Sequence, residues 1–414
     1  MLNFSIGSLF FAVLLFITPI ILRIGKKYRT GLFLIINIAV FLLCLKSLPA
    51  LFIGALWILV PYFMAPLLQR ASEETAGVLP RILRNSFYLL MVAVFAYLMH
   101  YEWVPLFKIL PYSNAVKLLG LSYFLFREID FTMQYGYLKE TNVRITLVDY
   151  LNYILNFYTV MAGPILRYEE FVTDFYDDTK PEMTGDMILH DFHRIMFGYI
   201  KVYVISAILS VWAGYWFQRL STGAGFFSLL AEFILFAFFN SFYIYFNFSG
   251  YCDVVAGGAH LSGMTLRENF DQPYFAVSLV EFWNRHHITL SEWIRDYIYS
   301  PVIKVLISGA FRKKIFAGQC VALFITFLIA GIWHGTNFNY VVYGLLQGLG
   351  IVISTLRTSH MKKKLGKKGF KEFQAKKWVR IVENCATWAY ISASFSFVGY
   401  DVCGLIAAHF GIIQ

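Results

Sequence analysis

Long apolar runs separated by short polar segments form the main pattern of this chain. Each run approaches the roughly 20 residues that an α-helix needs to cross the hydrocarbon core of a bilayer. The runs lie at about 4–22, 31–47, 49–68, 86–105, 114–134, 146–165, 187–217, 223–248, 315–333, 338–356 and 381–399. This pattern predicts an all-α polytopic membrane protein with about eleven transmembrane helices, within a range of roughly ten to twelve.

Residues 251–300 depart from this pattern, because they mix polar, aromatic and glycine residues. They are too polar for a lipid-facing helix and too apolar for a free loop. Non-helical backbone at membrane depth persists only inside protein or along a water-filled cavity. We therefore expect re-entrant or interfacial helices here, within a single transmembrane domain that covers residues 1–414 and has no internal repeat.

The composition narrows the class of protein further. Hydrophobic residues make up 58% of the 414 positions, charged residues 14%, and the mean hydropathy is +0.61. Soluble domains carry about 45–50% apolar and about 25% charged residues. A soluble enzyme, a disordered chain and a fibrous protein are therefore all disfavoured.

The net charge of +10 comes almost entirely from residues 357–380, which contain ten lysines and arginines and one glutamate. A basic loop between apolar runs is typical of the cytoplasmic side, so nucleic-acid binding is not indicated. This loop could bind a carrier protein, anionic lipid or nothing. Basic residues follow the first run, from Arg23 to Arg29, and predict a retained helix with an extracytoplasmic N-terminus in a cell membrane.

Metal and disulfide chemistry are not indicated. The five cysteines are scattered and form no C-x-x-C pair, which disfavours a disulfide framework and a zinc site. His190 and His193 have H-x-x-H spacing, but an interfacial polar patch explains this pair better than a metal does. We predict no metal site.

His334 is the first candidate for chemistry. It closes an apolar run that begins after the basic residues 312–314, so the charge rule places it at membrane depth, towards the outer half. Gly335 is a suitable helix stop. Ionisable groups at such depth are costly and mark functional sites by default. A hydrogen-bonded packing histidine is the alternative.

His286 and His287 form the second candidate. Thr289 and Glu292 have the spacing of a capping box, and an amphipathic apolar stripe follows, so a helix is expected to begin directly after the two histidines. The positive end of that helix disfavours imidazolium. A neutral imidazole there could accept a proton or donate to a carbonyl oxygen. The alternative is a solvated pair at the membrane interface.

Other polar residues interrupt the apolar runs. Structural ion pairing is the preferred explanation of Arg127 with Glu128 or Asp130, because charged groups at membrane depth pair with each other. Asn247 and Asp253 flank a Gly-containing aromatic segment, and their function is open on the residues alone.

Taken together, these segments resemble the membrane-bound O-acyltransferase (MBOAT) family. The sequence EFWNRHHITLSEWIRDY at 281–297, within Tyr274–Pro301, is similar to the hallmark segment of that family, and Trp333-His334-Gly335 is similar to its second motif. Upstream matches are LSYF at 121–124, MAGP at 161–164 and FSGYCD at 248–253, so the signature region spans about residues 120–350. Within the family, RENFDQPY at 267–274 and NRHH at 284–287 resemble the teichoic acid D-alanyltransferases.

The resemblance implies a ring of tilted helices around a thinned centre, where a tunnel joins the two membrane faces. It implies that His334 is the catalytic histidine and His287 the second functional histidine. Burial would keep His334 uncharged and suited to act as a base, while His287 would orient the donor or donate to the developing oxyanion. Candidate substrate or tunnel residues are His286, Asn284, Asn247, Asp253 and Trp333.

The resemblance also implies partners. A cytoplasmic carrier protein would present D-alanine as a phosphopantetheine thioester, with no cofactor bound by the chain itself. The acceptor would be an extracytoplasmic hydroxyl on a lipid-linked (lipo)teichoic acid of a Gram-positive cell wall, reached with a membrane-anchored pathway partner. The apolar residues Val302, Ile303 and Val305 are the candidate carrier-docking surface, although a plain interfacial or spanning helix explains them equally well.

Three other functions fit parts of the sequence. An O-acetyltransferase of exopolysaccharide or peptidoglycan would differ in its acyl donor. A transporter or flippase would line a path with intramembrane charges such as Arg127, Glu128 and Asp130. A non-catalytic scaffold would have little reason to hold histidines at membrane depth.

Overall fold

The computed structural model describes residues 7–45, 47–73, 77–109, 120–222 and 225–409. These residues are mostly helical; among them there is no β-strand, and Phe270 and His286 form an isolated antiparallel bridge. The chain forms two compact units. The N-terminal unit comprises residues 1–100, 105–200 and 250–267, and the C-terminal unit comprises 101–104, 201–249 and 268–414. The all-α prediction is confirmed for the described residues.

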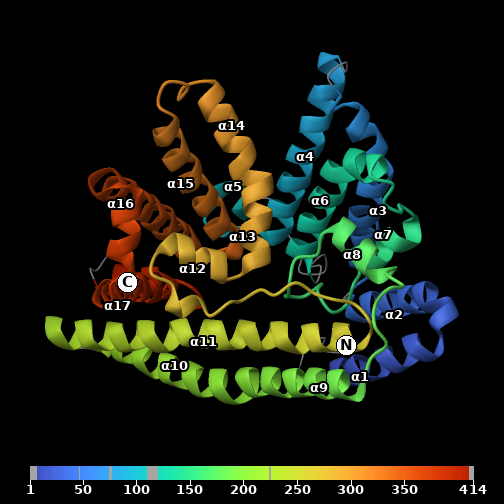
Figure 1. Cartoon of the computed structure of the whole chain (residues 1–414), viewed down its shortest axis with the longest axis horizontal. Helices are drawn as coiled ribbons and strands as arrows, with labels where there is room; N and C mark the ends of the chain where they lie inside the picture. Colours follow the sequence, from blue (N-terminus) through green and yellow to red (C-terminus); the bar gives the residue numbers. More distant parts are fainter. Residues whose placement is uncertain (1–6, 46, 74–76, 110–119, 223–224, 410–414) are drawn as a thin grey trace. The chain divides into compact units, whose positions relative to one another are not determined.

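The N-terminal unit is built from short and long helices in chain order. These are α1 (Leu9–Ile24), α2 (Arg29–Cys44), α3 (Leu48–Arg70), α4 (Val78–Met99), α5 (Pro105–Ile109), α6 (Leu121–Glu140), α7 (Leu147–Ile154), α8 (Tyr168–Phe175) and α9 (Gly185–Ile200). Helix α3 packs on α6, and α2 packs on α7 (Figure 1). Ser47 and Thr146 start α3 and α7, because each side-chain hydroxyl accepts the backbone N–H three residues on.

Arg127 on α6 is fully buried and is held by the end of α7. Its guanidinium donates to the carbonyl oxygens of Tyr153 and Ile154, at 3.0 and 2.6 Å, and to Oγ1 of Thr159 at 2.5 Å. The last carbonyls of a helix have no partner within the helix, so a buried guanidinium is a suitable cap. Within the described residues Arg127 forms no ion pair, and the predicted pairing with Glu128 or Asp130 is wrong.

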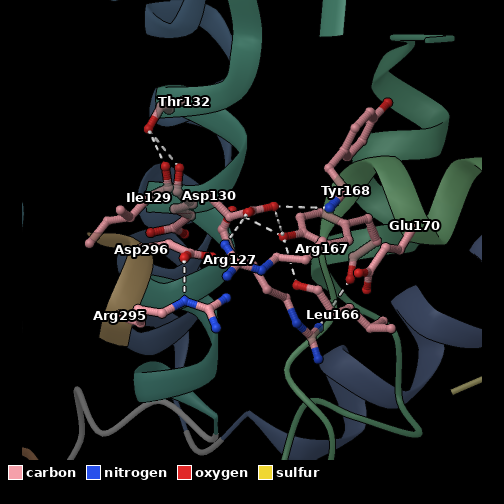
Figure 2. Close-up of polar contacts among 12 residues, drawn as sticks. Arg127, Ile129, Asp130, Thr132, Leu166, Arg167, Tyr168, Glu170, Arg295 and Asp296 are labelled. Atoms are coloured by element: carbon pink, nitrogen blue, oxygen red, sulfur yellow. Dashed lines mark hydrogen bonds and ion pairs between the residues drawn. The ribbon is translucent and has the colours of Figure 1, made fainter. Parts of the chain in front are cut away.

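Asp130 instead joins α6 to the start of α8. Its carboxylate accepts from Nη1 of Arg167 at 2.9 Å and from the backbone N–H of Tyr168 at 2.9 Å (Figure 2). The neighbouring carboxyl group of Glu128 is buried and accepts no hydrogen bond from a described residue. The side chains of Arg127 and Asp130 therefore act as structural clamps.

The C-terminal unit contains the segment that the sequence singled out. After α10 (Ser206–Thr222) and most of α11 (Phe226–Leu261), its helices are α12 (Leu279–Arg285), α13 (Ile288–Ile294), α14 (Ser300–Ser308), α15 (Ile315–His334), α16 (Phe338–Ala375), α17 (Lys377–Phe395) and α18 (Val402–His409). Figure 1 shows α14 and α15 side by side, and α16 and α17 as the last long pair.

Glycines let α15 and α16 approach closely. A Cβ atom added to Gly331 would lie 2.2 Å from Cα of Gly344, so neither position has room for a side chain. Small residues are what allow such contacts between membrane helices. The close contact brings the end of α15, with His334, against Tyr343 on α16.

Six described helices are long and apolar enough to span a membrane. They are Leu48–Arg70, Val78–Met99, Gly185–Thr222, Phe226–Leu261, Ile315–His334 and Phe338–Ala375, and α1 and α2 are shorter apolar helices. The predicted span 146–165 is wrong: α7 ends at Ile154, and Arg127 caps its last two carbonyls. Part of the predicted span 114–134 lies outside the described residues. The count of about eleven therefore stays a prediction.

Two local predictions need correction. Residues 357–380 are not a loop: α16 continues to Ala375, with a break at Gly366 (φ 70°, ψ 166°), and α17 begins at Lys377. Lysine is a good helix former, and glycine tolerates the positive φ at the break. In addition, α13 begins at Ile288 rather than after Thr289, so Thr289 and Glu292 form no capping box.

Candidate active site

The two adjacent histidines lie on a short extended connection between α12 and α13. Residues 269–271 run antiparallel to this connection. The backbone N–H of Asp271 donates to the carbonyl of Arg285 at 2.9 Å, and that of Ile288 donates to the carbonyl of Asn269 at 3.0 Å. The connection is therefore fixed by backbone pairing, although it is neither helix nor strand.

His287 has a left-handed backbone (φ 51°) and is the residue directly before α13. A non-glycine residue rarely adopts this conformation unless the surroundings impose it, and such residues cluster at functional sites. Asn269 supplies the constraint: its Oδ1 accepts from N and Oγ1 of Thr289, at 3.2 and 2.8 Å, and lies 3.3 Å from Nδ1 of His287. The prediction that a helix begins directly after the two histidines is confirmed.

The contact with Asn269 also assigns the tautomer of His287. Because Oδ1 of Asn269 is an acceptor, the proton of a neutral His287 ring belongs on Nδ1. Nε2 then carries a lone pair and cannot donate to an oxyanion. This geometry favours an orienting or proton-accepting role for His287 over donation to the oxyanion.

His286 is enclosed by aromatic rings. Its ring stacks on Phe282 at a centroid distance of 4.9 Å and meets Phe270 and Phe395 edge-on at 5.0 and 5.6 Å. Neither ring nitrogen has a hydrogen-bond partner among the described residues. His286 and His287 are only 5% and 4% exposed, which excludes the alternative of a solvated pair.

Burial sets the charge of both residues. It lowers the pKa of His286 to about 3 and lowers the pKa of His287 well below its ordinary value, and the charge of the neighbouring His334 adds to both shifts. An apolar surround disfavours imidazolium. Both rings are therefore neutral at pH 7.

His334 differs from the other two histidines in its accessibility. It is the last residue of α15, as predicted, and its side chain is exposed to a cavity in the C-terminal unit. Its ring lies 4.6 Å from that of Trp333 and 5.8 Å from that of Tyr343, between centroids. His334 thus closes a candidate membrane-spanning helix and is accessible from the cavity.

The cavity has a volume of about 1030 Å³ and is lined by residues of α12, α13, α15 and α16. Asn284 and Trp283 of α12 lie on its wall together with His334. Nε1 of Trp283 donates to Oε1 of Gln347, whose Nε2 donates to Oγ of Ser394, at 3.2 and 2.7 Å. This chain of hydrogen bonds fixes the wall beside the histidine. Whether the cavity continues as a tunnel stays a prediction.

The other predicted site residues, His286, His287, Asn247, Asp253 and Trp333, are not among the residues that line this cavity. Asn247, on α11, donates to Oγ of Ser206 at 3.3 Å and does not line the cavity. Asp253 belongs to the N-terminal unit, where its carboxylate pairs with Arg194 at 3.1 Å. Trp333 contacts His334 without lining the cavity.

The predicted docking residues lie on α14. Val305 is 70% exposed, while Val302 and Ile303 are half-buried. An exposed valine beside two partly covered apolar residues is compatible with a docking surface and with a lipid-facing helix. The role of these three residues stays a prediction.

Asn269 and Gln347 are the residues that sequence reasoning missed. Asn269 was part of the segment RENFDQPY, but a lone asparagine 18 residues before a histidine gives no signal of contact with it. Gln347 lies 13 residues after His334 in an apolar run, and its polar side chain there was a signal that could have been used.

Comparison with known proteins identifies the family. The model of MBOAT, the membrane-bound O-acyltransferase family, matches residues 82–396. The chain belongs to this family. The match includes both histidine motifs and most of the helices of the C-terminal unit.

Two kinds of protein are among the relatives of this MBOAT chain. A probable alginate O-acetylase of Pseudomonas putida is 33% identical over 243 residues, which cover 58% of this chain and 46% of that protein. The teichoic acid D-alanyltransferase of Bacillus subtilis is 27% identical over 287 residues, 69% of each chain, and that of Lacticaseibacillus rhamnosus is 26% identical over 357 residues, 82% and 84%. The match thus spans about half the length of the alginate O-acetylases and more of the D-alanyltransferases.

Proposed function

We propose that this protein is a multi-pass membrane acyltransferase that passes D-alanine from a carrier-protein thioester to an extracytoplasmic hydroxyl for teichoic acid D-alanylation, with His334 as general base. The main observation in support is that His334 is accessible on the wall of a large cavity, near two buried neutral histidines. The D-alanyltransferase relatives support the choice of acyl group, because the match extends over most of their length.

The reaction depends more on activation of the hydroxyl nucleophile by a base than on activation of the thioester carbonyl. A thioester carbonyl is already reactive, whereas a hydroxyl is a weak nucleophile at neutral pH. His334 would take the hydroxyl proton as the oxygen attacks the carbonyl carbon. When the intermediate collapses, the C–S bond breaks and the leaving thiolate receives that proton from His334. A positioned base contributes about 10²–10⁴-fold to such a rate.

The surrounding residues would support this step in different ways. The side-chain amide of Asn284, exposed on the cavity wall, could donate to the carbonyl oxygen. His287, fixed by Asn269, would orient the donor through residues of the wall, and His286 would support Trp283 of that wall. No metal is invoked for this role.

O-Acetyl transfer is the second candidate, because the alginate O-acetylases are 31–33% identical over the matched region. It needs the same histidine and differs in the acyl donor. A transporter gains less support, since Arg127 and Asp130, which would line its path, are occupied by structural contacts.

The test combines purified protein, D-alanyl-loaded carrier protein and detergent-extracted membrane acceptor, with His334→Ala beside the wild type. We expect loss of the carrier thioester with wild type and a rate lower by about 10²–10⁴-fold with the variant. The variant must elute as a monodisperse species with the wild-type thermal midpoint. Carrier that stays loaded while an acetyl donor is consumed would favour the second candidate.

A further inference from the structure

One face of α16 forms a continuous wall of the cavity. The residues on this face recur every three or four positions, as one stripe of a helix requires; they are Tyr343, Gln347, Ile351, Thr355, Ser359 and Lys362. At 1.5 Å per residue, the 19 steps from Tyr343 to Lys362 correspond to about 28 Å along the helix axis. The cavity is therefore elongated along α16.

The chemistry of the wall changes along this stripe. The ring of Tyr343 lies against His334, and the indole N–H of Trp283 is bound by Gln347, so the first end is the candidate reaction centre. Ile351 follows as an apolar position. The far end carries hydroxyl groups and then the ammonium of Lys362. A ligand that fits has one reactive end and one anionic end.

Lys362 differs from the other cations near the cavity because its charge is not neutralised. Arg295, on the same cavity wall, pairs with Asp296 at 3.1 Å, and Arg357 on α16 pairs with Glu383 at 2.5 Å. Lys362 is exposed and forms no ion pair with any residue in the described ranges, and the carboxylate of Glu292, which also lines the cavity, is not its partner. The ammonium of Lys362 is therefore available to an anionic ligand.

The break in α16 is followed by an aromatic ring that contacts Lys362. The positive φ of Gly366 redirects the chain, and Phe370, four residues later, becomes 4% exposed and joins the cavity wall. The ammonium of Lys362 lies over the Phe370 ring, 5.7 Å from its centroid. A cation–π contact of this kind holds the charge without neutralising it.

We infer that Lys362 binds the phosphate group of the acyl donor, at the end of the cavity opposite His334. This inference rests on the proposed function, because a phosphopantetheine thioester has its phosphate and its reactive carbonyl at opposite ends of a flexible arm. Lysine binds phosphate as a point charge. Lys362 is then a specificity residue that distinguishes a phosphorylated donor arm from an unphosphorylated one.

The experiment uses two free donors that differ only in this group, D-alanyl-4′-phosphopantetheine and D-alanyl-pantetheine. Thiol release is measured with full-length protein in neutral detergent and membrane acceptor, and binding of the two unacylated arms is measured separately. The variants are Lys362→Gln, Lys362→Arg and Lys363→Gln. Lys363 is the matched control, since it removes the same charge from the neighbouring position of α16 and does not line the cavity.

We expect wild type and Lys363→Gln to prefer the phosphorylated donor by about tenfold in kcat/KM, as one charge-assisted contact provides. Lys362→Gln should lose this preference and act on the pantetheine donor as wild type does, while Lys362→Arg retains part of it. Equal use of both donors by wild type, or a preference that survives in Lys362→Gln, would overturn the inference.

Further outcomes distinguish failure of the phosphate site from failure of the proposed function. If loaded carrier is consumed but neither free arm binds, the phosphate site is wrong and the proposed function stands. If neither loaded carrier nor free donor is consumed, the proposed function fails. If, in addition, the phosphopantetheine and pantetheine arms bind equally well, the phosphate site at Lys362 is rejected too. Lys362→Gln could also lower the rates with both donors equally, and only when anionic lipid is added. Lys362 would then bind a lipid headgroup, and the inference would be overturned.

Discussion

Two groups of polar side chains that interrupt or close apolar runs look alike in sequence and differ in structure. In the N-terminal unit, Arg127 and Asp130 are buried and almost every polar atom they offer is bound to backbone or side chain. In the C-terminal unit, both ring nitrogens of His286 lack a described partner, and His334 is exposed to a cavity.

The contrast shows that burial of a polar group at membrane depth is a weak sign of function. A buried group costs free energy unless it is hydrogen-bonded, so a bound one is explained by structure alone. A group that keeps its hydrogen-bonding capacity beside a space large enough for a substrate requires another explanation. Arg127 belongs to the first kind and His334 to the second.

Removal of Arg127 tests whether this residue is structural, and it should have the largest effect on stability of the variants proposed. In Arg127→Met the carbonyls of Tyr153 and Ile154 and the hydroxyl of Thr159 lose a buried donor. An unsatisfied buried group costs about 1–3 kcal/mol, so we expect a loss of more than about 3 kcal/mol. The measurement is the thermal midpoint and the yield of monodisperse protein in detergent.

The matched control is Arg267→Met in the same unit. Arg267 pairs with Glu170 at 3.3 Å, the two side chains are 42% and 44% exposed, and an exposed ion pair contributes about 0–1 kcal/mol. An Arg127→Met protein that keeps its thermal midpoint while losing acyl transfer would contradict the structural role and revive a path lined by charges.

The histidine pair predicts a pH dependence of stability. Folding lowers the pKa of His286 and His287, so below about pH 6.5 the unfolded chain takes up protons that the folded protein does not. Stability should therefore fall as the pH falls, by up to about 1.4 kcal/mol per pH unit for each histidine. His286→Phe, which suits the aromatic surround, should lessen the fall in thermal midpoint between pH 7 and pH 5.

Phe270→Leu provides the control for this pH effect. It changes the same aromatic surround of His286 and leaves both histidines in place, so the slope of stability against pH should stay as it is in wild type. If His286→Phe and Phe270→Leu show the same slope, the buried pair does not govern acid stability.

Much of the fold could be predicted from hydropathy, and the errors have local causes. The apolar runs at 49–68 and 315–333 became α3 and α15 almost as drawn, because nothing within them competes for backbone hydrogen bonds. The run at 146–165 contains Asp149, Asn152, Asn156 and the pair Gly163-Pro164, and its helix ends at Ile154. These residues were a signal in the run itself, whereas the guanidinium of Arg127, which caps the last carbonyls, belongs to α6 and gives no sign there.

The site shows the same limit of sequence reasoning. The position of His334 at a helix end and of His287 before α13 followed from local pattern. The contact between Asn269 and His287 joins two segments whose pairing no periodicity indicates. The separation of Asp253 from the histidines into another compact unit was likewise out of reach, because both lie in the same polar stretch of sequence.

Asn269→Ala should test whether His287 works through its orientation. Loss of the Oδ1 acceptor frees the His287 ring and removes the bond that supports its left-handed backbone. We expect kcat to fall about tenfold, comparable to other supporting residues around functional ligands, with KM for the donor nearly unchanged. Asn269→Asp keeps the acceptor and should retain more activity; equal loss in both variants would point to folding instead.

Glu128→Gln should give the smallest effect and is the most direct test of the comparison itself. Glu128 is buried beside Arg127, and neither carboxyl oxygen accepts a hydrogen bond from a described residue. Burial without a hydrogen-bond partner strongly disfavours a charged carboxylate, so we expect this group to be protonated. Gln has the same shape and no charge, and the variant should therefore change stability by less than about 0.5 kcal/mol and leave acyl transfer intact. A large loss of transfer in a stable Glu128→Gln protein would show that an ionisable group is needed there, and the distinction drawn between the two polar groups would fail at this residue.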